Sequence, residues 1–413
     1  MMYTEKLLFS RRKLMKHTAK KWTAWIVCTV MLITTLVSPV IAASDTITDE
    51  GWTKLVSTRH TLDCSGQQGM GVGDTYLYSV MTGGKDTKAI VFRTNKDTGR
   101  TILMKNGDTN KNYFTNLGHG NDADVAVIDG KEYLFVLASG NDIATGNIVV
   151  FEVDGTTLRQ TAQYTLHYNG GNFNPVGFAV YKVDEKNITF LFKWSHKTLS
   201  TGKIAKDKTE GKISVNIKCY LDSTAVVVNG KKRDFTGFAN QGIAVYGDIV
   251  LAVYAGCYEV ETVYQSLVLG FDLSQIEKGT PTLKPREDLI FYLESSDYPR
   301  CFEIEDCGIS TDGKMYFNAN CWKSLSDTNH DGVFVLNDFV MPNMPQYLFG
   351  DVNGDESVTV ADAVALWLYA KGGYPLSADR AGVADINGDG RVTPGDSLFL
   401  LVYISGGKLP EHK

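Results

Sequence analysis

The stretch QQGMGVGDTYLYSVMT, residues 67–82, combines a short run of small residues, a turn and a strand rich in aromatic residues. Four later stretches repeat this order: GNDADVAVIDGKEYLFVLAS from residue 120, NPVGFAVYKVDEKNITFLFKW from 174, NQGIAVYGDIVLAVYAG from 240 and EDCGISTDGKMYFNANC from 305. The repeats start 53 to 66 residues apart, and a second strand pair often follows. Four strands per unit at this period are typical of β-propeller blades. The sequence therefore predicts a mainly β protein with a five-bladed β-propeller.

Two other all-β folds remain open for this region. A β-sandwich would also be rich in Val, Ile, Tyr, Phe and Thr and in D-G, N-G and G-G turns, but it does not explain five copies of one pattern. A β-solenoid would have shorter repeats. The motifs QGMGV, LGHGNDADVAV and QGIAV resemble those of secreted bacterial propellers that include the helveticin-like proteins. This resemblance implies the propeller fold.

The start of each repeat is where the propeller would place a ligand site. The first strand of each blade lines the central channel, so the residues just before it lie at the channel mouth. The polar residues expected there are Gln67, Gln68, His119, Asn121, Asp122, Asn172, Asn174, Asn240, Gln241, Glu303, Glu305 and Asp306. Glycoside cleavage needs two carboxyl groups about 5–10 Å apart. We take Asp122 and Glu305 as candidate catalytic residues, with His119 tuning a pKa or binding a metal.

Other interpretations of the mouth remain open. Asp124, Glu303 and Asp306 are alternative members of a carboxyl pair across the channel. Gln-Gly and Asn-Asp before a strand are also ordinary turn chemistry, because their side chains cap backbone groups. A structural cation in the channel is a further alternative. The sequence contains no G-x-S-x-G, H-E-x-x-H or phosphate-binding glycine loop.

The C-terminal part repeats a second pattern, GDVNGDESVTVADAVALWLYA at 350–370 and ADINGDGRVTPGDSLFLLVYI at 384–404. Each copy has oxygen-bearing residues at positions 1, 3, 5, 9 and 12 of a twelve-residue loop, with a carbonyl at position 7, which suits the hard cation Ca²⁺. The candidate ligands are Asp351, Asn353, Asp355, Ser357, Thr359 and Asp362, and then Asp385, Asn387, Asp389, Arg391, Thr393 and Asp396. Position 6 is Gly390 in the second loop but Glu356 in the first, so the first loop is expected to bind more weakly. Two acidic surface turns are the alternative.

Each loop is followed by an apolar run at helical spacing that stops at Gly-Gly. A loop with only its exiting helix is half of an EF-hand, and the pair resembles the type I dockerin domain of cellulosome proteins. The resemblance implies a small all-α module that binds two Ca²⁺ ions and the cohesin domain of a scaffoldin. It also implies that loop positions 10 and 11 and some helix residues face the cohesin: Val360, Ala361, Trp367, Leu368, Pro394, Gly395, Leu401 and Val402.

The N-terminal residues 1–43 are typical of a secretory signal peptide. Seven Lys or Arg precede the uncharged run WTAWIVCTVMLITTLV, and small residues follow it. A retained membrane anchor is the alternative, although the run is short for a span. Removal of the segment leaves 34 basic and 46 acidic residues, a net charge of −12. This charge argues against nucleic-acid binding. The six remaining cysteines permit disulfides.

Together these patterns predict a signal peptide at 1–43, a propeller at 44–340, a linker at 341–349 and a dockerin at 350–410. We expect a secreted, extracellular protein, associated with a cellulosome or the cell surface and without stable membrane insertion. It would take part in plant polysaccharide degradation. The propeller would be a glycoside hydrolase or polysaccharide lyase, or else a non-catalytic module that binds a carbohydrate or a cell-surface partner.

Overall fold

The computed structural model describes residues 45–83, 85–139, 147–224, 226–256, 264–277, 282–341, 350–353, 358–373, 384–387 and 391–406. The predicted signal peptide lies outside these residues. In the described part of the chain, no helix is long and apolar enough to cross a membrane. The five described cysteines are all buried free thiols, so they form none of the disulfides that the sequence permits.

The first three sheets follow one another along the chain. The first contains β3 Cys64–Val72, β4 Tyr76–Gly83, β5 Lys88–Asn95 and β6 Thr101–Leu103. The second contains β8 Asp122–Ile128, β9 Lys131–Ala138, β10 Asn147–Asp154 and β11 Thr157–Tyr168, with the short strands β7 Lys105–Asn106, β12 Gly171–Asn172 and β16 Glu210–Ser214 on β11. The third contains β13 Gly177–Val183, β14 Asn187–Trp194, β15 Thr198–Ala205, β17 Asn216–Leu221 and β23 Thr282–Leu283.

Two further sheets complete the β region. The fourth contains β20 Ala239–Tyr246, β21 Ile249–Gly256, β22 Gln265–Asp272, β24 Pro285–Glu294 and β1 Thr46–Ile47. The fifth contains β25 Cys301–Ile309, β26 Met315–Trp322, β27 Gly332–Leu336 and β2 Trp52–Ser57. A hairpin of β18 Val226–Val228 and β19 Lys231–Arg233, the turn η1 Asp49–Gly51 and the short helix α2 Ser274–Glu277 lie between these strands in the sequence.

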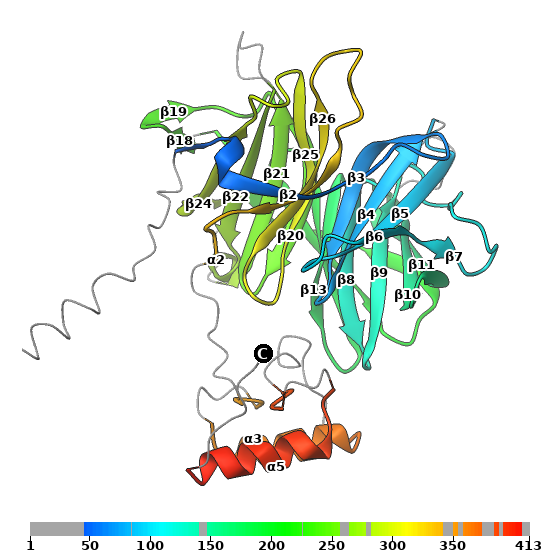
Figure 1. Ribbon diagram of the computed structural model, residues 1–413, viewed down its shortest axis with the longest axis vertical. Helices are drawn as coiled ribbons and strands as arrows, with labels where there is room; N and C mark the ends of the chain where they lie inside the picture. The colour runs from blue at the N-terminus through cyan, green and yellow to red at the C-terminus, as the bar shows by residue number, and fades with distance from the viewer. Residues whose placement is uncertain are drawn as a thin grey trace, which may run out of the picture. The chain divides into compact units, whose positions relative to one another are not determined.

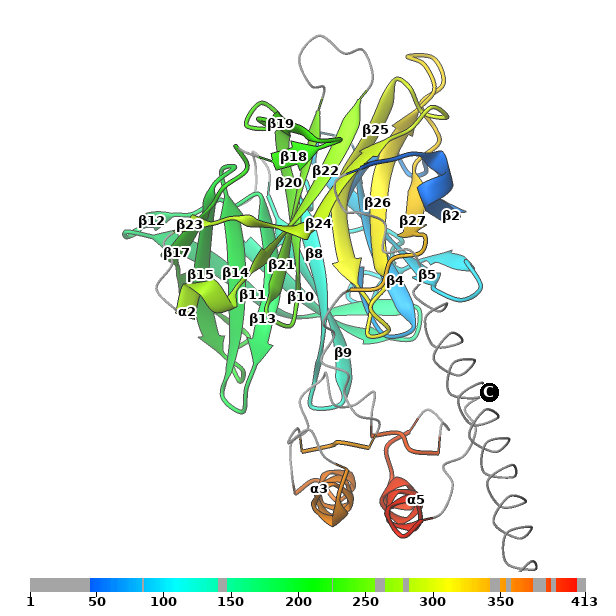
Figure 2. The same cartoon turned by 90° about the vertical axis from the view of Figure 1, so that its left-hand side faces the viewer.

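The innermost strands of the sheets form a closed ring. Strand β3 contacts β8, β8 contacts β13, β13 contacts β20, β20 contacts β25, and β25 contacts β3 again. Four sheets take their four main strands from one continuous segment, whereas the fifth takes its outer strand β2 from the N-terminal side. The predicted mainly β, propeller-like arrangement is therefore confirmed (Figures 1 and 2). Joining β2 to β27 ties the two ends of the ring together.

The second strand of each sheet is buried because a neighbouring sheet covers each of its faces. Strand β21, IVLAVYAG, is buried at every residue but the last, and it reads as a continuous apolar run for this reason. Its side chains enter two different cores: Leu251 and Val253 pack towards the fifth sheet, and Val250 and Ala252 towards the third. Burial of apolar area between sheets, at roughly 25 cal/mol per Å², is the main force holding the ring.

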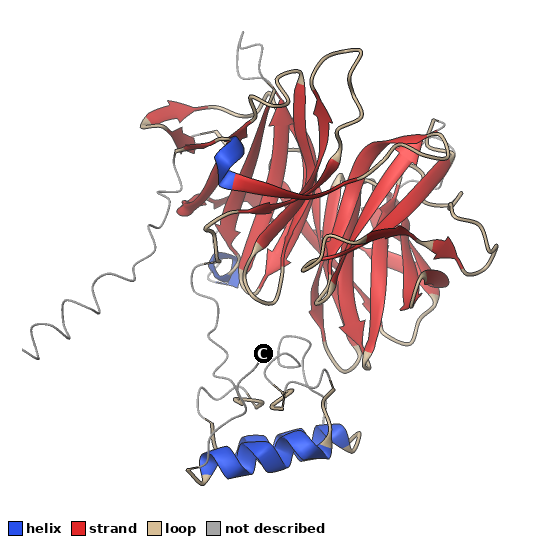
Figure 3. Cartoon of the chain, viewed as in Figure 1, coloured by secondary structure: helices blue, strands red, loops and turns tan. Residues whose placement is uncertain are grey.

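The longer helices lie in the C-terminal part, as Figure 3 shows. Helix α3 spans Val360–Ala370 and α5 spans Pro394–Ile404. Each begins with a capping box, Thr359 with Asp362 and Thr393 with Asp396. The two helices contact each other over a small core that includes Val352, Leu366, Ile386 and Leu400. This small helical region agrees with the predicted loop–helix duplication.

Candidate functional site

A pair of glutamates, both among the residues expected at the channel mouth, lies on the inner strand β25. Glu303 and Glu305 hydrogen-bond to each other through their side chains. Glu303 is partly exposed, and its Oε1 accepts hydrogen bonds from Gln241 Nε2 at 3.0 Å and Tyr264 Oη at 2.9 Å. Glu305 is only 5% exposed, and its Oε1 accepts a bond from Asn320 Nδ2 at 2.6 Å. Residues from the fourth and fifth sheets thus hold two carboxyl groups together.

The surroundings of this glutamate pair favour one shared proton. Burial, and then the neighbouring charge of Glu303, raise the pKa of Glu305 well above its usual value, although the bond from Asn320 opposes the shift. Burial and the same carboxylate raise the pKa of Tyr264. Burial therefore favours the protonated form of Glu305, which can donate a hydrogen bond to the neighbouring Glu303 carboxyl group. A donor next to a carboxylate can bind hydroxyl groups or transfer a proton.

Asp122 lies deeper than the glutamate pair, on β8, and is fully buried. Its Oδ2 accepts hydrogen bonds from the backbone amides of Phe178 at 2.8 Å and Ile243 at 3.0 Å. Its carboxyl group also hydrogen-bonds to that of Asp306, across the ring. The structure thus brings Asp122 together with Asp306 and not with Glu305. Its catalytic role stays a prediction.

His119 is not part of the glutamate pair. Its Nδ1 lies 2.8 Å from Asp86 Oδ1, and its side chain is 42% exposed. Two of the expected mouth residues bond to neighbouring turns: Asn121 Oδ1 accepts from Ser139 Oγ, and Asn240 Nδ2 donates to Ser195 O. The contact of Asn240 with a backbone carbonyl matches the turn-chemistry interpretation, whereas that of Asn121 joins two side chains.

Other mouth residues act through their backbone or remain exposed. The backbone of Gln67 bonds to the side chain of Asn320, and the backbone carbonyl of Gln68 accepts from Asn318 Nδ2. Asn172 and Asn174 are exposed. The residues that the sequence did not single out are Tyr264 and Asn320. They lie just before β22 and on β26, outside the inner strands, so no repeat pattern indicated them.

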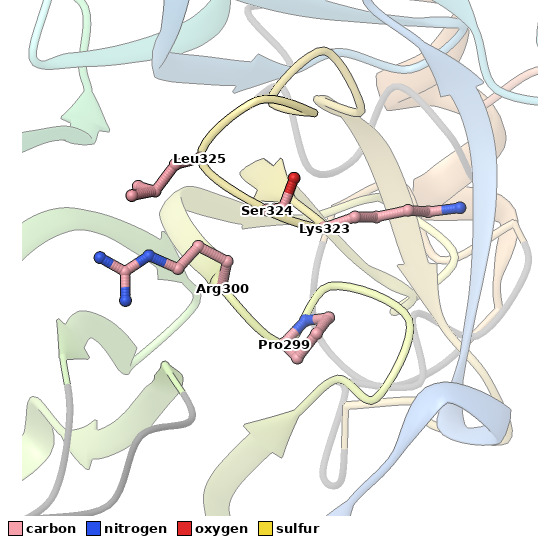
Figure 4. A pocket seen from close by; sticks show the side chains of 5 residues that line it. All are labelled: Pro299, Arg300, Lys323, Ser324 and Leu325. Atoms are coloured by element: carbon pink, nitrogen blue, oxygen red, sulfur yellow. The ribbon is translucent and has the colours of Figure 1, made fainter.

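One pocket lies at the same end of the fifth sheet as the glutamate pair. It is lined by Pro299, Arg300, Lys323, Ser324 and Leu325 (Figure 4). The loop before β25 and the loop after β26 form it, because the start of β25 pairs with the end of β26. Its two cationic side chains and its apolar rim differ in chemistry from the acidic mouth.

The two predicted calcium loops have matching hydrogen bonds. In the first, Asp362 Oδ1 accepts from the amide of Asn353 at 3.0 Å, and Oδ2 accepts from the amide of Thr359 at 2.8 Å. In the second, Asp396 makes the same bonds to Asn387 and Thr393, at 3.0 and 2.8 Å. The twelfth-position acid therefore orders each loop by binding the amides at positions 3 and 9.

The described loop residues fit an oxygen-ligated cation. Asp351, Asp362 and Asp396 are buried carboxyl groups, and the other described side-chain candidates offer amide or hydroxyl oxygens, which suit Ca²⁺. The candidates Asp355, Ser357 and Asp389 lie outside the described residues. Within the described ranges, no three His, Cys, Asp or Glu residues cluster closely enough to hold a metal. One acid of each loop, Asp355 or Asp389, lies outside those ranges.

The residues expected to face a cohesin form an apolar surface on both helices. Val360, Trp367 and Leu368 on α3 are 36–54% exposed, and Leu401 and Val402 on α5 are 38% and 54% exposed. Ala361 is exposed, and Pro394 and Gly395 are partly exposed. Four further exposed residues, Val364, Leu398, Phe399 and Tyr403, lie on the same helices. Exposed apolar groups in such numbers are typical of a binding surface.

Comparisons with known proteins identify the C-terminal region. Residues 349–405 match the family model of the dockerin type I domain, which confirms the predicted dockerin. No curated protein matches the chain.

Three solved structures are similar to 69% of this chain. A GH43_1 enzyme from Xanthomonas citri is 9% identical, with a TM-score of 0.40 and 89% of that chain covered. The catalytic domain of a GH62 α-L-arabinofuranosidase from Coprinopsis cinerea is 11% identical, with a TM-score of 0.35 and 96% covered. The tail fibre of Staphylococcus aureus phage P68 is 10% identical, with a TM-score of 0.39 and 52% covered.

Proposed function

We propose that this chain is a secreted protein whose residues 350–410 attach it, in a Ca²⁺-dependent way, to a cohesin domain of a scaffoldin. The observation that carries this proposal is the duplicated loop within the region that matches the dockerin model. Asp362 and Asp396 order their loops through the same amide bonds, 34 residues apart. Type I dockerins are extracellular cellulosome components, so the protein would work beside enzymes of polysaccharide degradation.

Two Ca²⁺ ions would be held by the oxygen atoms of the two loops. The first loop would use Asp351, Asn353, Asp355, Thr359 and Asp362 with the carbonyl of Ser357, and the second would use their counterparts 34 residues later. The cation supplies charge that offsets the buried carboxylates. The twelfth-position acids position the loop amides, and the capped helices present the apolar surface.

Cohesin capture by the full chain tests this proposal. We expect binding to an immobilised type I cohesin in Ca²⁺ and its loss in excess chelator. The double variant Asp351→Ala/Asp385→Ala should lose capture in Ca²⁺, since both first-position ligands are gone. The control Asp129→Ala/Asp154→Ala removes two exposed propeller carboxylates and should bind normally. Undiminished capture by the loop variant, across several type I cohesins, would refute the proposal.

For the propeller, residues 44–340, we propose a glycan ligand at the channel mouth, with residues 341–349 as the linker to the dockerin. The glutamate pair of Glu303 and Glu305 supports this, because it supplies a proton donor and an acceptor near solvent beside Tyr264. Glycosidic cleavage would need a carboxyl pair of suitable spacing around the sugar. A non-catalytic carbohydrate- or surface-binding module is the alternative.

Release of reducing sugar separates these two roles. The full chain is incubated with a panel of cell-wall polysaccharides, and both release and retention on insoluble substrate are measured. Release that disappears in Glu305→Gln would identify a hydrolase. Retention without release, lost in Glu303→Gln, would identify a binding module. A matched control is Glu210→Gln, an exposed glutamate on β16. If the protein neither releases sugar from any substrate nor is retained on one, the proposal of a glycan ligand is contradicted.

A further inference from the structure

One position recurs in all five inner strands and meets at the axis of the ring. It is occupied by Gly69, Asp122, Gly177, Gly242 and Asp306. A Cβ atom at Gly177 would lie 2.9 Å from Asp122 Oδ2, and one at Gly242 would overlap the carboxyl group of Asp306. Gly177 and Gly242 therefore leave the space that the two aspartate side chains fill, and Gly69 leaves space for the backbone of Asp122 and Ala123. The repeated Q-G, N-D and E-D pairs of the sequence end at this position, and this packing explains why they recur.

The two aspartates accept hydrogen bonds from the next residue of every inner strand. Asp122 accepts from the third and fourth sheets, and Asp306 from the first, second and fifth. The amides are those of Phe178 and Ile243 for Asp122, and of Met70, Ala123 and Cys307 for Asp306, at 2.7–3.4 Å. Inner strands have a free edge whose buried N–H groups need acceptors. The carboxyl groups provide those acceptors. Through these side-chain-to-backbone hydrogen bonds, the two aspartates link the five sheets.

A buried ammonium group accompanies the two carboxyl groups. Lys193, on β14, is fully buried, and its Nζ donates to Gly242 O at 3.2 Å and Val253 O at 2.8 Å, above the ring of Tyr254. We call Asp122, Asp306 and Lys193 the axial hub. Two carboxylates and one ammonium would leave a net buried charge, which is costly. One proton between the carboxyl groups makes the hub neutral.

A second observation points to the same proton. Asp122 Oδ1 is buried, and no N–H or hydroxyl donor reaches it. The side chain that hydrogen-bonds to this carboxyl group is that of Asp306, and a carboxyl group can donate only when it is protonated. We propose that the axial hub is a proton-dependent lock, in which one proton shared by Asp122 and Asp306 and balanced by Lys193 holds the five inner strands together.

The expected pH dependence follows from the direction of each shift. Burial and the charge of Asp122 raise the pKa of Asp306 well above its usual value, and burial raises that of Asp122 to about 7. Burial lowers the pKa of Lys193 to about 7. Asp124, Cys307 and Tyr254 are further titratable groups beside the hub. From pH 5.5 to 7 the folded hub thus keeps at least one proton that the unfolded chain has lost, so stability falls as pH rises.

Unfolding of the full chain at several pH values, with Ca²⁺ in excess, tests the lock. Asp306→Asn keeps an oxygen for the amides of Met70 and Ala123 and an N–H for Asp122, but it loses the acceptor for Cys307 and cannot titrate. Between pH 5.5 and 7 we expect the folding equilibrium constant of the wild type to fall with rising pH. For each pH unit, this fall should be about tenfold greater than the fall for Asp306→Asn. Asp129→Asn, an exposed control, should keep the wild-type slope. Equal slopes in the wild type and Asp306→Asn would overturn the proposal.

If Asp306→Asn does not fold, infrared spectroscopy of another variant decides. Glu305→Gln removes the shared proton of the channel mouth and leaves the hub intact. We expect its spectrum to keep the absorption of a protonated carboxyl group at pH 7. If this absorption is absent, the hub holds no proton, and the lock is refuted.

Discussion

The axial hub and the calcium loops use buried aspartates for the same task in different ways. In both, a carboxyl group accepts amide hydrogen bonds from a neighbouring segment: Asp122 binds two strands of other sheets, and Asp362 binds two amides of its own loop. In the hub, the counter-charge comes from Lys193 and a proposed proton, both of which belong to the fold. In the loops, we propose that it comes from an external cation.

This difference predicts which part of the molecule depends on solution conditions. A unit with an internal counter-charge folds without a ligand, but it is sensitive to pH. A unit that needs a cation to offset its carboxylates gains folding free energy from metal binding. The comparison can therefore be tested by removing the cation, by filling the hub, by altering the apolar surface and by neutralising a mouth carboxyl.

Removal of Ca²⁺ should have the largest effect. In excess chelator we expect the full chain to lose the helical circular dichroism of residues 345–413, because the loop carboxylates then lack their counter-charge. The strand signal of the propeller should remain, with an unchanged thermal midpoint. Circular dichroism with and without chelator checks this, and re-addition of Ca²⁺ is the control. A helical signal that survives chelation would contradict the cation requirement.

Filling the hub should be the next largest effect. Gly242→Ala puts a methyl group into the carboxyl group of Asp306, and we expect it to lower the free energy of unfolding by about 3 kcal/mol. Gly237→Ala is the matched control, since no atom lies near its added Cβ, and it should be close to neutral. Urea unfolding followed by tryptophan fluorescence compares them. Equal stabilities would mean that the inner strands do not pack as tightly as described.

The sequence predicted the repeat but not the contacts that its polar residues make. From the sequence alone, the Q-G, N-D and E-D pairs of the inner strands indicate a ligand mouth or turns, because spacing alone gives no three-dimensional ring. The pairing of Asp122 with Asp306 depends on the closure of that ring by β25 and β3. Lys193 gave no signal, since a single lysine at the end of an apolar strand is usually exposed.

The C-terminal region was more predictable because its chemistry is local. All ligands of one calcium loop lie within twelve residues, so spacing alone indicates which oxygens converge. The capping threonines and the exposed residues Trp367 and Leu401 follow from the helical period of the same short segments. Tyr264 and Asn320 at the mouth lack such a local pattern, because they reach Glu303 and Glu305 from other strands.

Polar substitution of the apolar helix surface should weaken cohesin binding without unfolding the loops. We expect Trp367→Ser or Leu401→Ser to cost about 2 kcal/mol of binding free energy, whichever helix contacts the partner more closely. Calorimetry of the full chain with a type I cohesin in Ca²⁺ measures this. Lys371→Ser, just beyond α3, is a control that leaves the apolar surface intact. Full affinity in both Trp367→Ser and Leu401→Ser would mean that the cohesin contacts another surface.

The smallest expected effect concerns the glutamate pair, where we expect a shared proton near solvent. Because the pKa of Glu305 is raised on folding, its contribution to stability is complete below its unfolded pKa and is lost as pH rises through the folded value. Glu305→Gln keeps an acceptor for Asn320 and a donor for Glu303 but cannot lose a proton. Its stability relative to the wild type should therefore improve by roughly 1 kcal/mol between pH 5 and pH 8.

Unfolding midpoints at the two pH values measure this difference, and Glu210→Gln, which is exposed, should show no change. If Glu305→Gln behaves like the control, the glutamates do not share a proton. The mouth would then be two separate carboxylates, and it would differ from the hub in chemistry as well as in exposure. If the shift is present, the mouth pair shares a proton, as we propose for the hub. Exposure alone then decides which of them a ligand can reach, and that pair is Glu303 and Glu305, because Asp122 and Asp306 are fully buried.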